Sequence, residues 1–298
     1  TATTEIYTLS LHDALPICKI IIAGALLLSL LMTTACGKNK TEDSGKEVVK
    51  KVTFAYRNTG NWPMTGDDKA GNPTGYDIDV LRLVDKELEG YEFDFVGTSY
   101  DDAYIGIESG NYDAALTNAF WTEERAEKYL IPEEALGASV LVLAVRSEDA
   151  AIKDFESLHD SGKQLAPILA GNGMFYVVKN FNQEKPDKAI NITTTDDSTY
   201  VAGSVEELVA GKYDAILWTK PQFDATVVAK DGENHSLLKS ISYSEFTTVN
   251  TYPMFSKNVG EDFIKEFSKA LKKVKDSGKA SEISQSYFNY DIWNYNFK

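Results

Sequence analysis

The chain has 298 residues, and its 45 acidic residues outnumber its 30 basic ones, so its formal net charge at pH 7 is −15. An acidic body of this kind lacks the basic surface that nucleic-acid binding needs, and we expect no nucleic-acid partner. The only cysteines are Cys18 and Cys36, and there are three histidines. The sequence therefore predicts no disulfide in the folded part, no metal site and no Ser-His-Asp triad.

The first residues look like an artefact followed by a targeting segment. Residues 1–17 resemble a translated sequencing adapter, and we exclude them from reasoning about the fold. Lys19 then precedes an apolar run from Ile20 to Met32. A run of this length is typical of a signal-peptide core, because a membrane-spanning helix needs about twenty apolar residues.

This run ends at Thr-Thr-Ala-Cys, which resembles a bacterial lipobox. Residues 18–35 are therefore predicted to be a truncated lipoprotein signal peptide, with Cys36 as the lipid attachment site. The alternative is an ordinary signal peptide that is cut near Ala35. Residues 36–50 are charged and contain Gly and Ser, a composition that favours a flexible tether.

From Val52 onward, short β-prone runs alternate with amphipathic segments, which is the pattern of an α/β protein. A long turn-rich loop, residues 58–74, separates the first strand from the first helix. The elements expected in the first half are strands at Val52–Tyr56, Tyr91–Val96 and Tyr112–Leu116, and helices at Gly75–Gly90, Asp101–Ser109 and from Thr122.

A near-continuous apolar strand, Ser139–Val145, begins the second half. Two helices are expected to close the chain, the first marked by apolar positions every three or four residues and ending at Gly278. Between them we expect an ordered segment at Phe155–Leu158, strands near Leu165–Ala170, Ile190–Thr194 and Tyr213–Trp218, and helices from Met174 and at Ser204–Ala210.

Arg125 is the first candidate for a binding residue. Thr122, followed by two glutamates, predicts a helix start just past the carboxyl end of the strand Tyr112–Leu116. Open α/β sheets place ligand groups at this end of their strands. A planar guanidinium there can bind a carboxylate through two hydrogen bonds. The alternative is that Arg125 lies in the first turn of an ordinary solvated helix.

Five motifs together resemble the extracytoplasmic solute-binding proteins of polar amino-acid ABC importers, family 3. In chain order they are GYDIDV, SGNYDA, TEERAEK, LVAGKYDAIL and DSGKASEISQSYF. The resemblance implies an α/β fold of the type II periplasmic-binding-protein class, with two α/β lobes and central mixed sheets. It places lobe 1 at residues 51–136 plus 251–298 and lobe 2 at residues 139–248, joined by crossing hinge segments near Ala135–Ser139 and Thr247–Thr251.

The same resemblance implies the ligand-binding residues, with Arg125 clamping an α-carboxylate. The others are Asn118, Phe120, Tyr100, Asn61, Trp62, Asn172, Gly173 and Thr219. Alternatives are core packing for Phe120, loop anchoring for Trp62 and plain helix capping at Asn172 and Gly173.

The chain departs from the family pattern at three of these positions. Phe120 stands where Ser or Thr is usual, Asn172 where Thr is common, and Thr219 where an aspartate accepts the ligand's ammonium. Arg57, at the end of the first strand, is interpreted as an exposed surface residue.

The resemblance implies a lipid-anchored binding protein that closes its lobes on a small carboxylated solute, most often an amino acid or derivative, and delivers it to ABC permease subunits. It would act as a monomer at the outer face of the bacterial cytoplasmic membrane, held there only by lipid, with no cofactor, metal or catalytic residue. Alternatives are a dehydratase-like enzyme on the same scaffold, which would need a general acid or base in the cleft, and a ligand-sensing ectodomain subunit.

Overall fold

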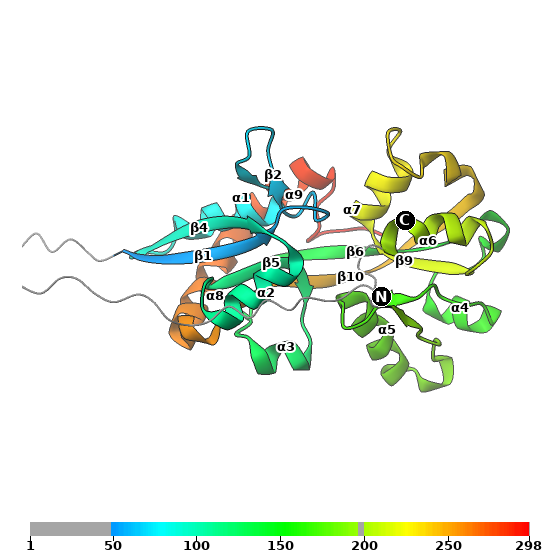
Figure 1. Ribbon diagram of the computed structural model, residues 1–298, viewed down its shortest axis with the longest axis horizontal. Coiled ribbons are helices and arrows are strands. Elements are labelled where there is room, and N and C mark those ends of the chain that lie inside the picture. Colours follow the sequence, from blue (N-terminus) through cyan, green and yellow to red (C-terminus); the bar gives the residue numbers. More distant parts are fainter. Residues whose placement is uncertain (1–48, 196–199, 298) are drawn as a thin grey trace, which may run out of the picture. The chain divides into compact units, whose positions relative to one another are not determined.

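The computed structural model describes residues 49–195 and 200–297 and shows a six-stranded mixed sheet flanked by helices (Figure 1). The strand β10 is antiparallel to both of its neighbours and joins a parallel half of the sheet to an antiparallel half. In spatial order the strands are β4 (Tyr91–Thr98), β1 (Lys50–Arg57), β5 (Ala114–Phe120), β10 (Ile241–Phe255), β6 (Gly137–Arg146) and β9 (Ala215–Thr219).

Helices and short strands complete the described part of the chain. The α-helices are α1 (Tyr76–Asp85), α2 (Tyr100–Ser109), α3 (Glu123–Lys128), α4 (Phe155–Ser161), α5 (Gly173–Glu184), α6 (Tyr200–Val209), α7 (Lys220–Phe223), α8 (Glu261–Asp276) and α9 (Lys279–Phe288). Two-residue strands pair as β2 (Gly66–Asp67) with β3 (Pro73–Thr74) and as β7 (Ile168–Leu169) with β8 (Thr194–Thr195).

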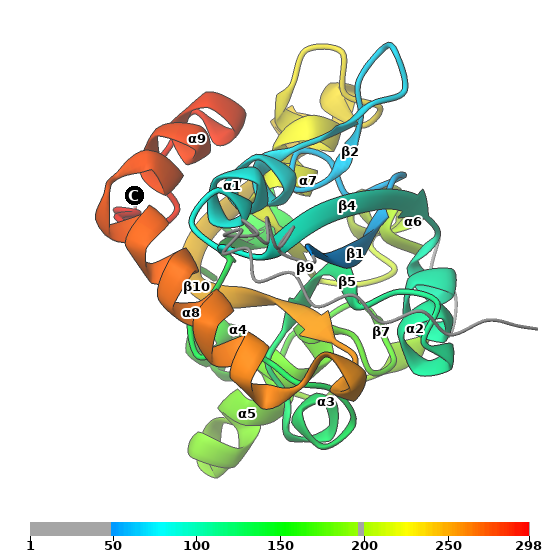
Figure 2. The same cartoon turned by 90° about the vertical axis from the view of Figure 1, so that its left-hand side faces the viewer.

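Both faces of the β4–β1–β5 half are covered by helices. Because side chains alternate along a strand, Phe54 and Tyr56 pack on the side of α1 and α8, whereas Ala55 packs against α2. Figure 2 shows α1, α8 and α9 together on one side of these strands, consistent with their mutual contacts. The apolar residues of α8, among them Phe263 and Phe267, recur at helical spacing and fill this core.

The strand β6 is buried on both of its faces. Leu141 and Leu143 belong to an apolar cluster with α4 and α5, and Val142 belongs to a second cluster with α6, α7 and β9. A strand that is covered on both sides has no need of polar residues, which explains the near-continuous apolar run that predicts it.

The predicted α/β fold is confirmed, and some element boundaries are wrong. The third strand was expected at Tyr112–Leu116 but runs from Ala114 to Phe120, so Asn118 and Phe120 lie within β5. The strand expected around Ile190–Thr194 is reduced to β8. The fifteen residues of β10 were expected only as a hinge crossing.

Several predictions concern residues that lie outside the described part of the chain, and one further prediction is not tested by the structure. The adapter-like residues 1–17, the signal segment 18–35, Cys36 and nearly all of the tether lie outside the described residues. The division into two lobes also stays a prediction. The two expected hinge segments lie in or next to β6 and β10, which pair with each other in a single sheet. No helix in residues 49–195 and 200–297 has the length and apolar character needed to cross a membrane.

Candidate functional site

Three polar side chains meet at the carboxyl-terminal edge of the parallel strands. Arg57 ends β1, Tyr100 follows β4 by two residues, and Arg125 follows β5 on α3. The strands β4, β1 and β5 are parallel neighbours, so their carboxyl ends lie at one edge of the sheet. This is the edge at which open α/β sheets bind ligands.

Arg125 is positioned by the local structure around the end of β5. Thr122 caps α3, and its hydroxyl accepts a hydrogen bond from the Arg125 backbone N–H at 3.1 Å. Nη1 of Arg125 donates to the Phe120 carbonyl at 2.7 Å, and Nη2 lies 3.5 Å from the Tyr100 hydroxyl. The side chain is half-buried, and no acidic group in the described part of the chain forms an ion pair with it. The guanidinium therefore keeps donors for an external anion.

The interpretation of Arg57 as an exposed surface residue is wrong. It is half-buried rather than exposed, and its Nη2 lies 2.9 Å from the position that a Cβ on Gly60 would take. Burial lowers the pKa of Arg57, and the nearby Tyr100 partly offsets this effect. The only signal in the sequence was a basic residue directly after a predicted buried strand. Whether an acidic side chain lies close enough to form an ion pair with it depends on the tertiary fold.

Asn118 and Phe120 approach the other half of the sheet from the end of β5. Asn118 has a positive φ of 55°, which is uncommon for a residue with a side chain, and its Nδ2 donates to Ser139 Oγ at 3.1 Å. Phe120 is buried and packs with apolar side chains of the β6 region. A Cβ built on Gly173 would lie only 2.2 Å from Cδ2 of Phe120, so the ring fills the space above that glycine.

Asn172 and Gly173 come to the same region at the start of α5. Oδ1 of Asn172 accepts from the Phe175 backbone N–H at 2.9 Å, so Asn172 is the helix cap. One turn later, the Tyr176 hydroxyl donates to Glu124 on α3 at 2.7 Å. The structure therefore brings Asn172, Gly173, Phe120 and α3 together.

Asn61, Trp62 and Thr219 have other surroundings. Asn61 is buried and donates to Thr65 Oγ1 at 2.7 Å, and Trp62 is 53 % exposed with its ring edge-on to Tyr287 of α9. Thr219 is buried at the end of β9 and donates to Gln222 at 3.1 Å. The contacts described for these three residues do not include Arg125, so their predicted ligand contacts stay untested.

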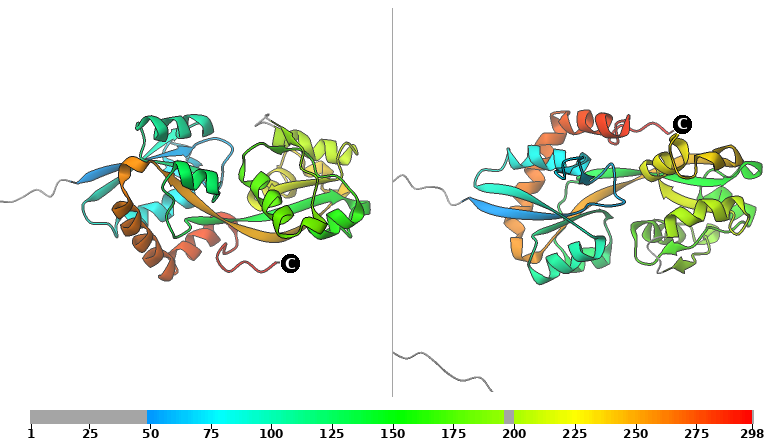
Figure 3. Two further views of the ribbon diagram at one scale, coloured as in Figure 1. Left: turned by 90° about the horizontal axis from the view of Figure 1, so that it is seen from below. Right: turned by 45° about the horizontal axis from the view of Figure 1, so that its top comes forward.

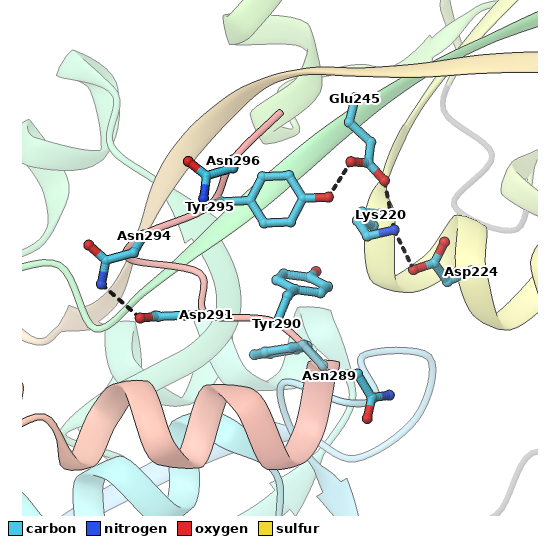
Figure 4. Close-up of a pocket in the computed structure, with 10 residues that line it drawn as sticks. Lys220, Asp224, Glu245, Asn289, Tyr290, Asp291, Asn294, Tyr295 and Asn296 are labelled. Carbon is cyan, nitrogen blue, oxygen red and sulfur yellow. Dashed lines mark hydrogen bonds and ion pairs between the residues drawn. The ribbon is translucent and has the colours of Figure 1, made fainter. Parts of the chain in front are cut away.

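A separate cavity of about 470 Å³ lies beside the C-terminal segment and not at the carboxyl edge of the parallel strands. Figure 4 shows the Tyr295 hydroxyl hydrogen-bonded to Glu245. Lys220 forms ion pairs with both Glu245 and Asp224. Within the described residues we find no group of three or more His, Cys, Asp or Glu side chains placed to hold a metal ion. At the strand edge, the hydrogen-bond donors described above are the guanidinium groups of Arg57 and Arg125 and the phenol of Tyr100.

Comparison with known families identifies the chain. Residues 52–290 match the family described as bacterial extracellular solute-binding proteins, family 3. The chain belongs to this family. Its members' architecture, the type II periplasmic-binding-protein fold, agrees with the mixed α/β structure described above.

Individual relatives are distant in sequence but match over most of their length. The probable amino-acid-binding protein YxeM of Bacillus subtilis (strain 168) is 24% identical over 280 residues, covering 91% of this chain and 95% of that protein. The L-cystine-binding protein TcyA of the same organism is 24% identical over 286 residues, covering 92% and 98%.

Solved structures show the same fold. One, described with glutathione import via GshT and the cystine ABC importer TcyBC of Streptococcus mutans, has a TM-score of 0.60 at 24% identity and covers 82% of this chain and 96% of its own. The ancestral amino acid-binding protein AncCDT-1, a precursor of cyclohexadienyl dehydratase, has a TM-score of 0.55 at 21% identity, covering 80% and 95%.

Proposed function

We propose that this solute-binding protein captures a small carboxylated solute, an amino acid or a derivative of one, and delivers it to an ABC importer. The observation that carries the proposal is Arg125, a half-buried guanidinium at the ligand-binding edge of the sheet with no acidic partner among the described residues. A ligand carboxylate would supply that partner through two charge-assisted hydrogen bonds. The names of the relatives, which are amino-acid- and cystine-binding proteins, support the solute class.

We further propose that the lobes close on the ligand, that the protein works without catalysis, and that lipid on Cys36 holds it at the outer face of the cytoplasmic membrane. Asn118, Phe120, Tyr100, Asn172 and Gly173 would line the closed site beside Arg125. Thr219 offers a hydroxyl where the family has an acid, so the ligand's ammonium would rely on another acceptor. Mass spectrometry of protein extracted from membranes tests the anchor, since an unmodified Cys36 contradicts it.

The binding function is tested with Arg125→Ala in the full chain. A thermal-shift panel of amino acids, cystine, dipeptides and small carboxylates first finds a ligand, because a ligand at 100 times its dissociation constant stabilises the protein by about 2.7 kcal/mol. Calorimetry should then show binding to the wild type and at least about a 100-fold loss in Arg125→Ala.

The matched control is Arg82→Ala. Arg82 lies on α1, which covers the same half of the sheet, but its guanidinium is already paired with Asp79 at 2.7 Å on the surface. This variant should bind as the wild type does. Unchanged affinity in Arg125→Ala, or loss of its folded circular-dichroism spectrum, would contradict the proposed role of Arg125.

A further inference from the structure

The cavity beside the C-terminal segment is formed by parts of the chain that are distant in sequence. It has a volume of about 470 Å³ and lies between α7, the middle of β10 and the residues that follow α9 (Figure 4). None of the residues proposed to contact the solute lines it. The family match ends at residue 290, and four lining residues lie beyond it: Asp291, Asn294, Tyr295 and Asn296. One wall of the cavity thus lies outside the part of the chain that the family pattern covers.

Negative charge exceeds positive charge in the lining of this cavity. Lys220 forms ion pairs with Asp224 at 2.8 Å and with Glu245 at 2.7 Å. Asp291 also lines the cavity, but it accepts hydrogen bonds only from a backbone N–H at 2.9 Å and from an asparagine amide at 2.8 Å. No basic side chain of the described residues forms an ion pair with Asp291. Three carboxylates and one ammonium give the lining a formal charge of −2, so it favours a cationic ligand.

Tyr290 supplies an unused hydrogen-bonding group in the same lining. Its hydroxyl is buried and has no hydrogen-bond partner among the described residues. Its ring is held by Phe288, stacked at 5.5 Å between centroids, and by Tyr295, edge-on at 4.9 Å. Burial raises the pKa of Tyr290, so the hydroxyl stays protonated and can both donate and accept hydrogen bonds. A buried hydroxyl without a partner is unfavourable, and a ligand in the cavity would supply that partner.

The remaining groups of the lining define the kind of cation. Nζ of Lys220 lies 5.6 Å from the centroid of the Tyr290 ring, so this ring already attracts one ammonium group. The side chains of Asn289 and Asn296 form no hydrogen bond with the described residues, and their amide oxygens can accept from N–H groups. Both asparagines are exposed, so the cavity is open to solvent. Acceptors for N–H groups beside aromatic rings, which pack well on methylene groups, fit a small aliphatic amine.

We propose that this cavity is a second ligand site, separate from the solute site, and that it binds a small aliphatic amine. The ammonium group donates to the Tyr290 hydroxyl, and the surplus carboxylate charge of the lining balances its positive charge. The alkyl chain packs against the aromatic rings. Because α7 and the C-terminal segment both line the cavity, a bound amine contacts both and restrains them together. The inference does not depend on which solute the protein captures.

The probes are the diamines putrescine and cadaverine, with 1,4-butanediol as a neutral molecule of the same length as putrescine. Ionic strength is held constant, because an acidic protein also attracts cations without specific contacts. Calorimetry on the full chain should show that the wild type binds at least one diamine roughly 10-fold more tightly than the diol. Amide hydrogen exchange should slow in residues 289–296 and in α7 when this diamine is bound.

Two substitutions in the lining test the assigned contacts. Tyr290→Phe should weaken diamine binding by about fivefold or more, because the ammonium loses one hydrogen bond. Urea unfolding of this variant without diamine should show no loss of stability, because the hydroxyl has no partner among the described residues. Asp291→Asn keeps a hydrogen-bond acceptor but removes a charge, and it should weaken diamine binding by a similar factor.

Two controls locate the binding. Asp276 lies on α8, pairs with Lys272 at 2.9 Å and does not line the cavity, so Asp276→Asn should bind the diamine as the wild type does. In Arg125→Ala the diamine should also bind as in the wild type, since it has no carboxylate for that guanidinium. The inference is wrong if neither diamine binds, if the diol binds as tightly, if Tyr290→Phe or Asp291→Asn leaves the affinity unchanged, or if Arg125→Ala abolishes diamine binding. The proposed function would still stand, because carboxylated solutes test it separately.

Discussion

At the scale of single residues, Asp77 is a buried carboxyl group with an unsatisfied oxygen in the described structure. Its side chain is nearly fully buried, and Oδ1 has no hydrogen-bond partner among the described residues. It faces the start of β6, where Oδ1 lies 3.5 Å from the Cβ position of Gly137, and the buried Thr251 hydroxyl beside it also lacks a partner there. Burial raises the pKa of Asp77 to about 7.

This raised pKa makes stability depend on pH in a defined direction. The unfolded carboxyl has a pKa of about 3.9, so between about pH 4 and pH 7 the folded state binds the extra proton. Stability from Asp77 is therefore highest below about pH 4, falls as the pH rises from about 4 to about 7, and levels off above that. Asp77→Asn, which cannot ionise, should match the wild type near pH 4 and exceed its stability at pH 8 by on the order of 4 kcal/mol. Urea unfolding across this range checks it; a constant difference between the two proteins would contradict the assignment.

The candidate site was predictable from the sequence only where local patterns define it. Arg125 could be found because Thr122 and two glutamates mark a helix start after a strand. The half-buried position of Arg57 could not be predicted in this way, because the absence of an ion pair depends on where the acidic side chains lie in the folded protein. The ligand contact expected for Phe120 stays a prediction, and no local pattern could have shown that its ring packs on Gly173, a residue 53 positions later.

At the scale of elements, the end of β5 and the α3 helix that follows it contact α5 through side chains. Phe120 at the end of β5 fills the space over Gly173, and Tyr176 donates to Glu124 of α3. Helix α5 begins at Gly173, and the Asn172 side chain caps it by accepting a hydrogen bond from the Phe175 backbone N–H. The contact therefore depends on the absence of a side chain at position 173.

We expect Gly173→Ala to break this contact without harming the helix. Alanine is favoured over glycine inside a helix by about 1 kcal/mol, and Gly173 does not have a positive φ. Its Cβ would nevertheless overlap the Phe120 ring, so the variant should lose about 1–3 kcal/mol of stability.

Removing the ring provides the test of this explanation. In the Phe120→Ala background, Gly173→Ala should become neutral or stabilising, which a double-mutant cycle of unfolding free energies measures. Equal losses in both backgrounds would mean that the ring does not cause the effect.

The success of element prediction followed the strength of the local signal. Helices α8 and α9 were found because apolar residues recur at helical spacing and glycine separates them at Gly278. The strand β10 was missed because SYSEFTTVN contains few apolar residues and its side chains are mostly half-buried or exposed. Its conformation is imposed by pairing with β5 and β6, which are distant in sequence.

At the scale of the whole described structure, the C-terminal segment that follows α9 adds a connection between the two halves of the sheet, which β6 and β10 already join. Ile292 packs in the core of the β1 half, and Trp293 donates to the Tyr76 hydroxyl at 3.0 Å. Two residues later, the Tyr295 hydroxyl donates to Glu245 in the middle of β10 (Figure 3, red segment; Figure 4). The segment thus runs from the core of one half to the strand that borders the other.

Glu245, which the C-terminal segment contacts, belongs to a cluster of charged side chains around Lys220. Burial would lower the pKa of Lys220, but hydrogen bonds to Asp224 and Glu245 outweigh it and raise the pKa. Lys220 lies 2.8 Å from Asp224 and 2.7 Å from Glu245. Glu245 therefore couples the C-terminal segment to α7 through a shared, largely buried lysine.

We expect Tyr295→Phe to loosen this connection. The lost hydrogen bond to a charged group should lower the free energy of unfolding by about 1.5 kcal/mol. Because the bond links the C-terminal segment to Glu245 and Lys220, amide hydrogen exchange should also rise in residues 290–297 and in α7. Tyr287→Phe is the control: its hydroxyl joins α9 to α1, donating to Asp79 at 2.6 Å and also bonding to Thr74 and the Gly75 N–H, so its loss should lower stability but leave exchange in α7 unchanged. If both variants raise exchange in α7 equally, or neither does, the C-terminal segment does not restrain that region, and its contact with Glu245 contributes only local stability.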